Sequence, residues 1–290
     1  MPDNTPVDQT LVGSNIDWRA WPIVGPPKIS SRFESGLNHR TLLIVSAGKQ
    51  YVLKIFESPA PMAIAAQRWA AKRGLAAKVV YAPNDGRYLL MDFLNSEELV
   101  ASEADITNIK AIAELTKALH EEGINQTGIT CGYFNYRAYC EQYLHECDPE
   151  IHELHHSLAS ALDIFSNDQT QPCFCHNDLV LGNCLLDNGK ALLIDWEFAQ
   201  INNPWFDLAS IIYYWQLNAT QSRAFLAAYH TDLEQQHQQP IFYAAQCAVL
   251  WLDILWHLDK FGSAHYSKLT EKIGHLKELA QALEVPLKII

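Results

Sequence analysis

Residues 173–198 read CFCHNDLVLGNCLLDNGKALLIDWEF, and polar side chains interrupt this otherwise apolar run. The interrupting residues are Asp178, Asn183 and Asp195. Short apolar runs bounded by turn residues are typical of buried strands. A buried carboxylate is costly unless it is paired or holds a metal. We therefore expect these acids and the amide to form one site.

Asn188 and Gly189 form the dipeptide that most strongly favours a two-residue hairpin turn. Such a turn pairs Leu186 with Ala191, Cys184 with Leu193, and Asn183 with Ile194. Asn183 and Asp195 then lie at the open end of the hairpin, on strands about 4.8 Å apart. Their oxygens suit Mg²⁺, which shares its remaining positions with water and phosphates.

Asp178 precedes Asn183 on the loop that enters the hairpin. The order His176-x-Asp178, then Asn183, then Asp195 follows the phosphoryl-transfer pattern. In that pattern the loop Asp accepts the proton of the acceptor hydroxyl, while the Asn and the second Asp hold Mg²⁺. The spacing predicts these roles here.

These segments resemble the choline kinase, thiamine kinase and aminoglycoside phosphotransferase family, which shares the protein-kinase-like fold. HNDLVLGN (176–183) is similar to its catalytic loop, and IDWEFA (194–199) is similar to its metal-binding segment. In NNPWFDLA (202–209), Asp207 stands in the place of the family's structural Asp, and His176 is expected to brace the loop. The resemblance extends over about residues 30–260 and implies ATP and Mg²⁺ as cofactors.

The pattern of the chain predicts an α+β, two-lobed protein-kinase-like fold, with a small β-rich N-lobe and a larger, mainly helical C-lobe. Strands are expected at 29–34, 41–47 and 51–56, a helix at 61–74, and a hairpin within 78–93. Helices are expected at 106–123, 134–146, 150–165, 206–216, 222–230 and 241–261. We place a nucleotide-binding lobe at 1–93 and a catalytic and substrate-binding lobe at 94–290.

The nucleotide site is expected in the first lobe. Lys54 lies inside the apolar strand VLKIF, where an inward-facing lysine needs an anion such as phosphate. The loop 34–40 resembles the family's glycine loop, with Gly36 and Asn38 near phosphate. The resemblance places Asp92, Phe93 and Leu94 at the hinge that contacts adenine.

One feature departs from the family pattern, which pairs the strand lysine with a Glu on the first-lobe helix. PMAIAAQRWAAKRG (61–74) has no Glu, and Gln67 is its one candidate partner for Lys54. Glu57 precedes the helix. The partner of Lys54 therefore stays open between a displaced acid and phosphate alone.

The acceptor is expected to be a small hydroxylated molecule. The second half is rich in aromatics, and aromatic faces attract quaternary ammonium or thiazolium groups. Asp253, Trp256, His257 and Lys260 share a helix face by spacing. Glu197, Trp205, Asp253 and Trp256 are the candidate substrate residues. Together with the net charge of −12, they favour a cationic, choline- or thiamine-like alcohol over an aminoglycoside or a sugar, both of which remain alternatives.

Two readings from other classes remain. His152-Glu153-x-x-His156 is a literal HExxH motif, the pattern of zinc hydrolases. No third ligand follows in a recognisable pattern, which favours a solvated helix face. The missing helix Glu would also suit a kinase-fold protein that binds but is catalytically silent.

Composition limits the remaining classes. The net charge of −12 argues against a nucleic-acid surface. The longest apolar stretch, which contains Asp253 and His257, looks too short and polar to insert into a membrane, and the N-terminus shows no signal pattern. Seven cysteines, with Cys173 and Cys175 as CxC, favour reduced thiols over disulfides or zinc. We expect a cytoplasmic protein. The sequence does not determine its oligomeric state.

Overall fold

The computed structural model describes residues 16–33, 39–95, 97–98, 105–121, 131–187, 190–236, 239–262 and 269–285. Its contacts divide the chain into two compact units. The N-terminal unit comprises residues 1–98 and 183–199, and the C-terminal unit comprises 99–182 and 200–290. Residues 183–199 thus group with the first part of the chain, although they follow the helices of the second.

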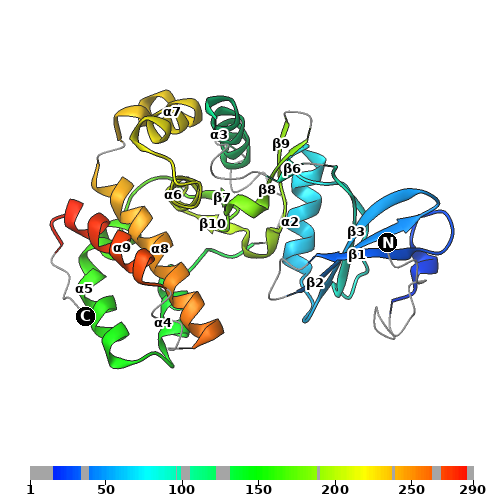
Figure 1. Ribbon diagram of the computed structural model, residues 1–290, viewed down its shortest axis with the longest axis horizontal. Coiled ribbons are helices and arrows are strands. Elements are labelled where there is room, and N and C mark those ends of the chain that lie inside the picture. Colours follow the sequence, from blue (N-terminus) through cyan, green and yellow to red (C-terminus); the bar gives the residue numbers. More distant parts are fainter. Residues whose placement is uncertain are drawn as a thin grey trace. The chain divides into compact units, whose positions relative to one another are not determined.

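The N-terminal unit is built on a five-stranded antiparallel sheet, in the order β1-β2-β3-β5-β4. Figure 1 labels β1, β2 and β3 of this sheet. Its elements are η1 (Trp18–Ala20), β1 (Lys28–Phe33), β2 (His39–Ser46), β3 (Lys49–Phe56), α2 (Pro61–Lys72), β4 (Val79–Tyr81) and β5 (Tyr88–Asp92). Every strand expected in this part of the chain is present. Ala47 and Gly48, with φ of 47° and 81°, make the tight turn between β2 and β3.

Helix α2 begins and ends where the sequence predicts. Pro61 occupies its first turn, where the missing backbone N–H is no loss. Gly74, with φ of 71°, follows the helix in a left-handed conformation that favours glycine. Gly86, with φ of 67°, belongs to the link between β4 and β5, which confirms the hairpin expected within 78–93.

A second sheet in this unit has the order β6-β8-β9. It consists of β6 (Glu97–Glu98), β8 (Cys184–Asp187) and β9 (Lys190–Leu193). Leu186 pairs with Ala191 and Cys184 with Leu193, as the hairpin register predicts. The turn residues Asn188 and Gly189 themselves lie outside the described residues. Short 3-10 turns, η3 (Leu181–Asn183) and η4 (Trp196–Phe198), flank the hairpin.

The C-terminal unit is mainly helical (Figure 1). Its helices are α3 (Ile106–His120), α4 (Tyr136–Leu144), α5 (Pro149–Ser166), α6 (Trp205–Tyr214), α7 (Ala219–Tyr229), η5 (Thr231–Gln236), α8 (Pro240–Phe261) and α9 (Thr270–Ala282). A small sheet pairs β7 (Cys173–Cys175) with β10 (Gln200–Asn202). The six helices expected from the sequence are all present.

Helix α8 forms the centre of this unit and packs against α4, α5, α6 and α9. Its 22 residues are long and apolar enough to cross a membrane by length and composition, which corrects the expectation that the segment is too short. However, 67% of its most apolar 18-residue stretch is buried within the protein. Burial therefore explains its apolar character without a membrane.

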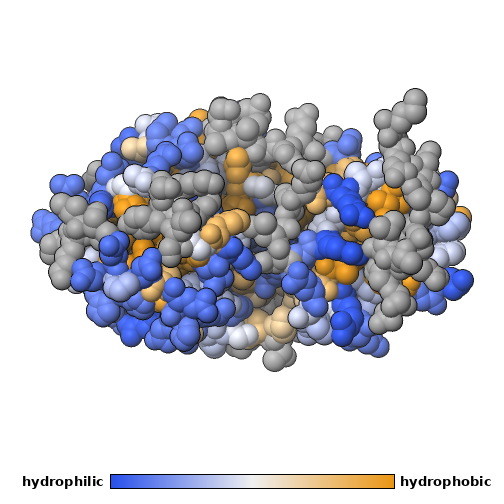
Figure 2. Space-filling model, turned by 60° about the horizontal axis from the view of Figure 1, so that its bottom comes forward, coloured by the Kyte–Doolittle hydropathy of each residue, from blue (hydrophilic) through white to orange (hydrophobic). Residues whose placement is uncertain are grey.

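On the surface, hydrophilic side chains cover most of the described part of the face drawn in Figure 2, and hydrophobic residues form smaller patches. Among described residues, the exposed large hydrophobic side chains are Val24, Phe33, Met62, Ile106, Tyr133 and Phe261. They come from several separate elements.

Candidate active site

Lys54 lies on β3 with 8% of its surface exposed, and its Nζ is 2.5 Å from Oδ1 of Asp195. Asp195 follows β9 in the left-handed conformation, with φ of 65°. The anion expected beside the lysine of the apolar strand VLKIF is therefore the carboxylate of Asp195. A small cavity adjoins the pair and is lined by Lys54, Phe56, Ala63, Gln67, Leu89, Met91, Asp195, Trp196 and Glu197.

Gln67, the helix residue expected to face Lys54, makes its hydrogen bond to the backbone instead. Its side chain is 2% exposed, and its Nε2 donates to the carbonyl oxygen of Ala77 at 2.7 Å. The Trp69 ring of the same helix contacts Trp196 edge-on, with ring centroids 6.4 Å apart. Helix α2 therefore supports the segment that carries Asp195 by packing, while its glutamine holds the backbone that follows the helix.

Asn183 closes the open end of the β8–β9 hairpin. Its carbonyl oxygen accepts a hydrogen bond of 3.0 Å from the backbone N–H of Ile194. The structure thus brings together Asn183 and the residue directly before Asp195, in the register that the Asn-Gly turn predicts. An amide oxygen and a carboxylate are hard donors, which is the chemistry that Mg²⁺ selects.

Glu197 lies in the N-terminal unit, on the same cavity as Lys54. Its Oε2 is 2.5 Å from His39 Nε2, and both side chains are 17% exposed. The His39 ring also meets Phe56 edge-on. This placement groups Glu197 with Lys54, which is expected to contact phosphate. The sequence had instead placed Glu197 among the candidate residues for the acceptor.

The other predicted nucleotide contacts have different positions in the structure. Asp92 ends β5 and forms an ion pair with Lys49 at 2.8 Å. Its backbone N–H donates to the backbone carbonyl oxygen of Lys78 at 2.9 Å, and Phe93 and Leu94 follow it without regular secondary structure. Gly36 and Asn38 lie outside the described residues. Their contacts with a nucleotide stay predictions.

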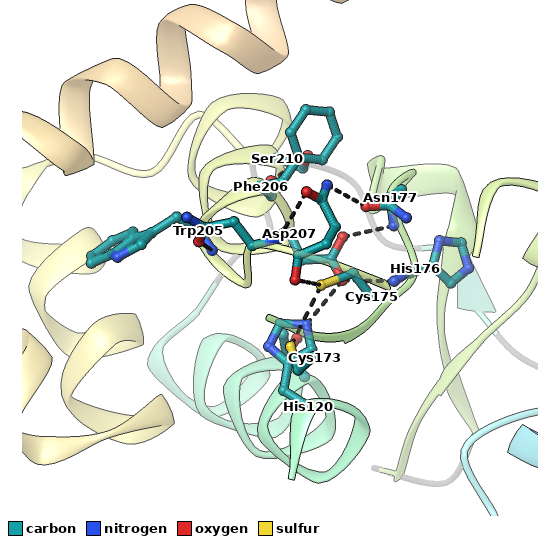
Figure 3. A network of polar contacts seen from close by, with 12 residues as sticks. His120, Cys173, Cys175, His176, Asn177, Trp205, Phe206, Asp207 and Ser210 are labelled. Atoms are coloured by element: carbon teal, nitrogen blue, oxygen red, sulfur yellow. Dashed lines mark hydrogen bonds and ion pairs between the residues drawn. The ribbon is translucent and has the colours of Figure 1, made fainter. Parts of the chain in front are cut away.

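Asp207 anchors the loop that leads to Asp178 (Figure 3). Its side chain is fully buried and accepts hydrogen bonds from the backbone N–H groups of His176 and Asn177, both at 2.8 Å. Its Oδ2 also lies 3.0 Å from Nε2 of His120 on α3. Asn177 has φ of 64°, an uncommon left-handed conformation for a residue other than glycine. The buried carboxylate thus fixes a strained turn immediately before the candidate base.

The pKa of Tyr214 depends on two carboxylates, those of Asp178 and Asp253. Burial raises the pKa of Tyr214 well above its usual value, and the negative charges of Asp253 and Asp178 raise it further. Asp178 comes from the loop after β7, Tyr214 from the end of α6, and Asp253 from α8. The C-terminal unit therefore gathers two carboxylates around one tyrosine.

Two cationic side chains compensate Asp253. Lys272 on α9 forms an ion pair with its Oδ2, and His257 Nδ1 lies 3.3 Å from its Oδ1. Burial would raise the pKa of Asp253, but the His257 hydrogen bond and the Lys272 charge outweigh it, and the pKa is lowered. The same hydrogen bond raises the pKa of His257. Lys260, which the spacing places on the same helix face as Asp253 and His257, is exposed at the end of α8.

The two candidate tryptophans differ in exposure. Trp205 is 3% exposed at the start of α6, so its ring belongs to the core in this structure. Trp256 is half-buried and meets the His257 ring at a centroid distance of 5.0 Å. Trp256 thus lies beside His257, which contacts Asp253.

The HExxH segment forms part of α5. Glu153 and His156 are exposed, and His156 Nδ1 lies 2.7 Å from the backbone oxygen of His152, one turn earlier. Within the described residues, the group that gathers metal-binding donors does not include this motif. The arrangement is that of a solvated helix face, as the sequence favoured.

A model of a family described as the phosphotransferase enzyme family matches residues 30–238. The curated protein LicA of Haemophilus influenzae is 32% identical to this chain over 119 residues, or 36% of this chain and 44% of LicA. The chain therefore matches less than half the length of this relative. The family match confirms the resemblance inferred from the catalytic-loop segments.

Solved structures confirm the predicted fold. A choline/ethanolamine kinase family protein from Mesorhizobium loti has a TM-score of 0.71 at 19% identity, covering 92% of both chains. The choline kinase LicA from Streptococcus pneumoniae has a TM-score of 0.70 at 18% identity, covering 86% of this chain and 94% of that chain. The chain thus has the α+β, protein-kinase-like architecture, with a β-sheet part and a helical part.

Proposed function

Because the chain belongs to the phosphotransferase enzyme family, we propose that it transfers the γ-phosphate of ATP to a hydroxyl group of a small molecule. The observation that carries the proposal is the Lys54–Asp195 pair, 2.5 Å apart beside a cavity. Phosphoryl transfer needs a lysine for the phosphates and an acid for the metal. Here the fold holds one of each, in contact.

Asp178 is the proposed base. As the acceptor oxygen attacks the γ-phosphorus, its carboxylate takes the hydroxyl proton. The new bond joins the acceptor oxygen to phosphorus, the bond between the γ-phosphorus and the bridging oxygen breaks, and ADP leaves. Asp207 contributes indirectly, by holding the backbone N–H groups of the two residues before Asp178.

Asn183 and Asp195 are the residues that would hold Mg²⁺. Their donor set of one amide and one carboxylate fits a hard cation that keeps several waters. When bound, the cation would supply positive charge to the phosphate oxygens. Lys54, which compensates Asp195 in this structure, is proposed to contact phosphate, together with Gly36 and Asn38 of the glycine loop.

For the acceptor we propose a choline- or thiamine-like cationic alcohol. The relatives include proteins described as choline kinases, and the carboxylates of Asp178 and Asp253 around Tyr214 suit a cation. Lys272 already compensates Asp253, so a cationic acceptor would have to share or displace this lysine. An aminoglycoside or a sugar remains the alternative acceptor.

The test is a screen for ADP release with Mg·ATP and choline, ethanolamine, thiamine, an aminoglycoside and a neutral sugar. We expect turnover with one of the cationic alcohols and its loss in Asp178→Ala. Asp163→Asn, which removes an exposed carboxylate from α5, is the matched control and should keep the activity. Turnover with the sugar alone would refute the cationic acceptor. Full activity of Asp178→Ala, or no turnover with any acceptor, would refute the phosphotransfer proposal and favour a binding protein.

A further inference from the structure

Among the described residues, three side chains with metal-binding donors gather in the C-terminal unit, and none of them is a proposed Mg²⁺ ligand. They are His120, at the end of α3, and Cys173 and Cys175, on β7 (Figure 3). Residues two apart in a strand point to the same face, so both sulfurs face His120. All three residues are buried, and their donor atoms lie within 4.8 Å of one another.

The sulfur separation fits a tetrahedral cation. Zn–S bonds of about 2.3 Å at a tetrahedral angle place two sulfurs about 3.8 Å apart. Cys173 Sγ and Cys175 Sγ are 3.6 Å apart. The strand therefore holds the two thiols at nearly the distance that a shared metal requires. The His120 donor needs to approach by about 1 Å at most, given a sulfur–nitrogen separation of about 3.5 Å in such a site and donor atoms that lie within 4.8 Å of one another.

The two thiols are in contact with each other, and Cys175 Sγ also lies 3.6 Å from the backbone oxygen of Asn202. The thiolate is the form of cysteine that binds metal, so a cation bound here would replace both thiol protons.

His120 has the second contacts that a metal-binding histidine needs. Its Nδ1 lies 2.9 Å from the Tyr229 hydroxyl, which would fix the ring while Nε2 faces the cation. Asp207 Oδ2, 3.0 Å from Nε2, is an adjacent oxygen that could complete four ligands. The cluster therefore shares Asp207 with the loop that carries His176 and Asn177.

We propose that His120, Cys173 and Cys175 form a site for one thiophilic divalent cation, such as Zn²⁺ or Cd²⁺. Binding forms two metal–sulfur bonds and one metal–nitrogen bond at His120 Nε2. The two thiol protons and the proton that Nε2 donates to Asp207 pass to solvent. The sequence alone favoured reduced core thiols because it lacked a CxxC pair. The site becomes visible only when the fold brings a histidine from 53 positions before Cys173 against the CxC strand. The inference does not depend on the proposed phosphotransfer activity.

The test uses the full chain, reduced with a phosphine and freed of metal by a chelator. Cd²⁺ is titrated in while the ultraviolet sulfur-to-cadmium charge-transfer band is recorded, and Zn²⁺ is then added in competition. We expect the band to saturate at one equivalent and to be lost on addition of Zn²⁺. Cys173→Ser and Cys175→Ser should each weaken Cd²⁺ binding at least about tenfold, in line with the loss of a metal ligand.

Cys247→Ser is the matched control, because this thiol is fully buried on α8 outside the cluster. It should keep the band and its stoichiometry. Circular dichroism of each variant verifies that it is folded. The absence of a band at one equivalent in the unchanged protein would overturn the proposal, and this arm needs no variant to fold. A band that survives unchanged in both folded serine variants would overturn it as well.

Discussion

Lys54 Nζ and Asp195 Oδ1 lie 2.5 Å apart although the two residues are separated by 141 positions in the chain. Protein kinases pair the corresponding lysine with a helix glutamate. Here α2 offers Gln67, which donates to Ala77, and the acid that follows β9 compensates the lysine instead. In the proposed function both partners have a further task, since Lys54 contacts phosphate and Asp195 holds the cation.

The first prediction concerns the energy of this pair. Lys54→Met or Asp195→Asn alone leaves the partner's charge partly buried without its counterion, whereas the double variant removes both charges. A double-mutant cycle, measured by urea denaturation without nucleotide or Mg²⁺, should give a coupling free energy of about 1 kcal/mol. The more exposed pair of Lys49 and Asp92 is the control and should give a smaller coupling. Additive effects of the two substitutions would contradict the prediction.

The second prediction concerns the proposed Mg²⁺ ligand Asn183. Asn183→Ala removes an amide oxygen while the β8–β9 ladder keeps its backbone pairing. We expect the Mg²⁺ concentration for half-maximal turnover to rise by about tenfold or more, with activity partly restored at high Mg²⁺. Asn218→Ala, which removes the amide that caps α7, should leave the Mg²⁺ dependence unchanged. An unchanged dependence in Asn183→Ala would exclude this residue as a ligand.

The third prediction concerns Asp207, which is fully buried. Asp207→Ala would leave two backbone N–H groups and His120 without their acceptor. Breaking a buried charged network in this way costs about 3–5 kcal/mol, so we expect a corresponding fall in the free energy of unfolding by urea. The exposed Asp163→Asn change should stay within about 0.5 kcal/mol of the unchanged protein. Equal stability of the two variants would refute the anchoring role.

Local chemistry explains why much of the fold could be predicted. Strand alternation and turn residues act over a few positions, so the pairing of Cys184 with Leu193 follows from the Asn-Gly dipeptide. A lysine within an apolar strand likewise predicts a nearby anion, but the strand does not show which residue or ligand supplies that anion. The helices and strands expected from periodicity therefore appear near their predicted bounds.

Contacts between distant segments could not be predicted in this way. Neither Asp195 as the partner of Lys54 nor Lys272 as the partner of Asp253 has a local signal, because each pair forms only when separate elements pack. Trp205 illustrates the same limit from the other side. An aromatic residue near a motif can equally fill the core, and the structure buries this one. The type of a residue suggests which chemistry it can perform, whereas packing decides whether its side chain lies at the site.

The fourth prediction is a pH dependence of stability. The pKa of Asp253 is lowered from 3.8, so its contribution is present above about 3.8 and is lost as the pH falls through the folded-state pKa. The pKa of His257 is raised from 6.5, so its contribution is present below about 6.5 and is lost as the pH rises through the folded-state pKa. Both contributions are therefore present between these two values.

Asp253→Asn removes both contributions. The difference in unfolding free energy between the unchanged protein and this variant should be larger at about pH 5.5 than at about pH 8.5. His257→Gln is the control, since it keeps the ion pair with Lys272 but removes the group that titrates in this range. A difference that grows with pH would reverse the sign and refute the assignment.

The last prediction asks whether Lys272 competes with the acceptor for Asp253. The lysine occupies Oδ2 of this carboxylate, and both side chains are mostly shielded from solvent. Lys272→Gln would remove the competing charge while His257 continues to hold the other oxygen. If the acceptor is a cationic alcohol that approaches Asp253, the KM for this acceptor should fall several-fold, because an unshielded buried carboxylate attracts a cation more strongly. The KM for ATP should not change. Lys277→Gln, which removes a lysine from the same helix, is the matched control and should alter neither constant. A higher KM for the acceptor in Lys272→Gln would instead show that the lysine contributes to acceptor binding.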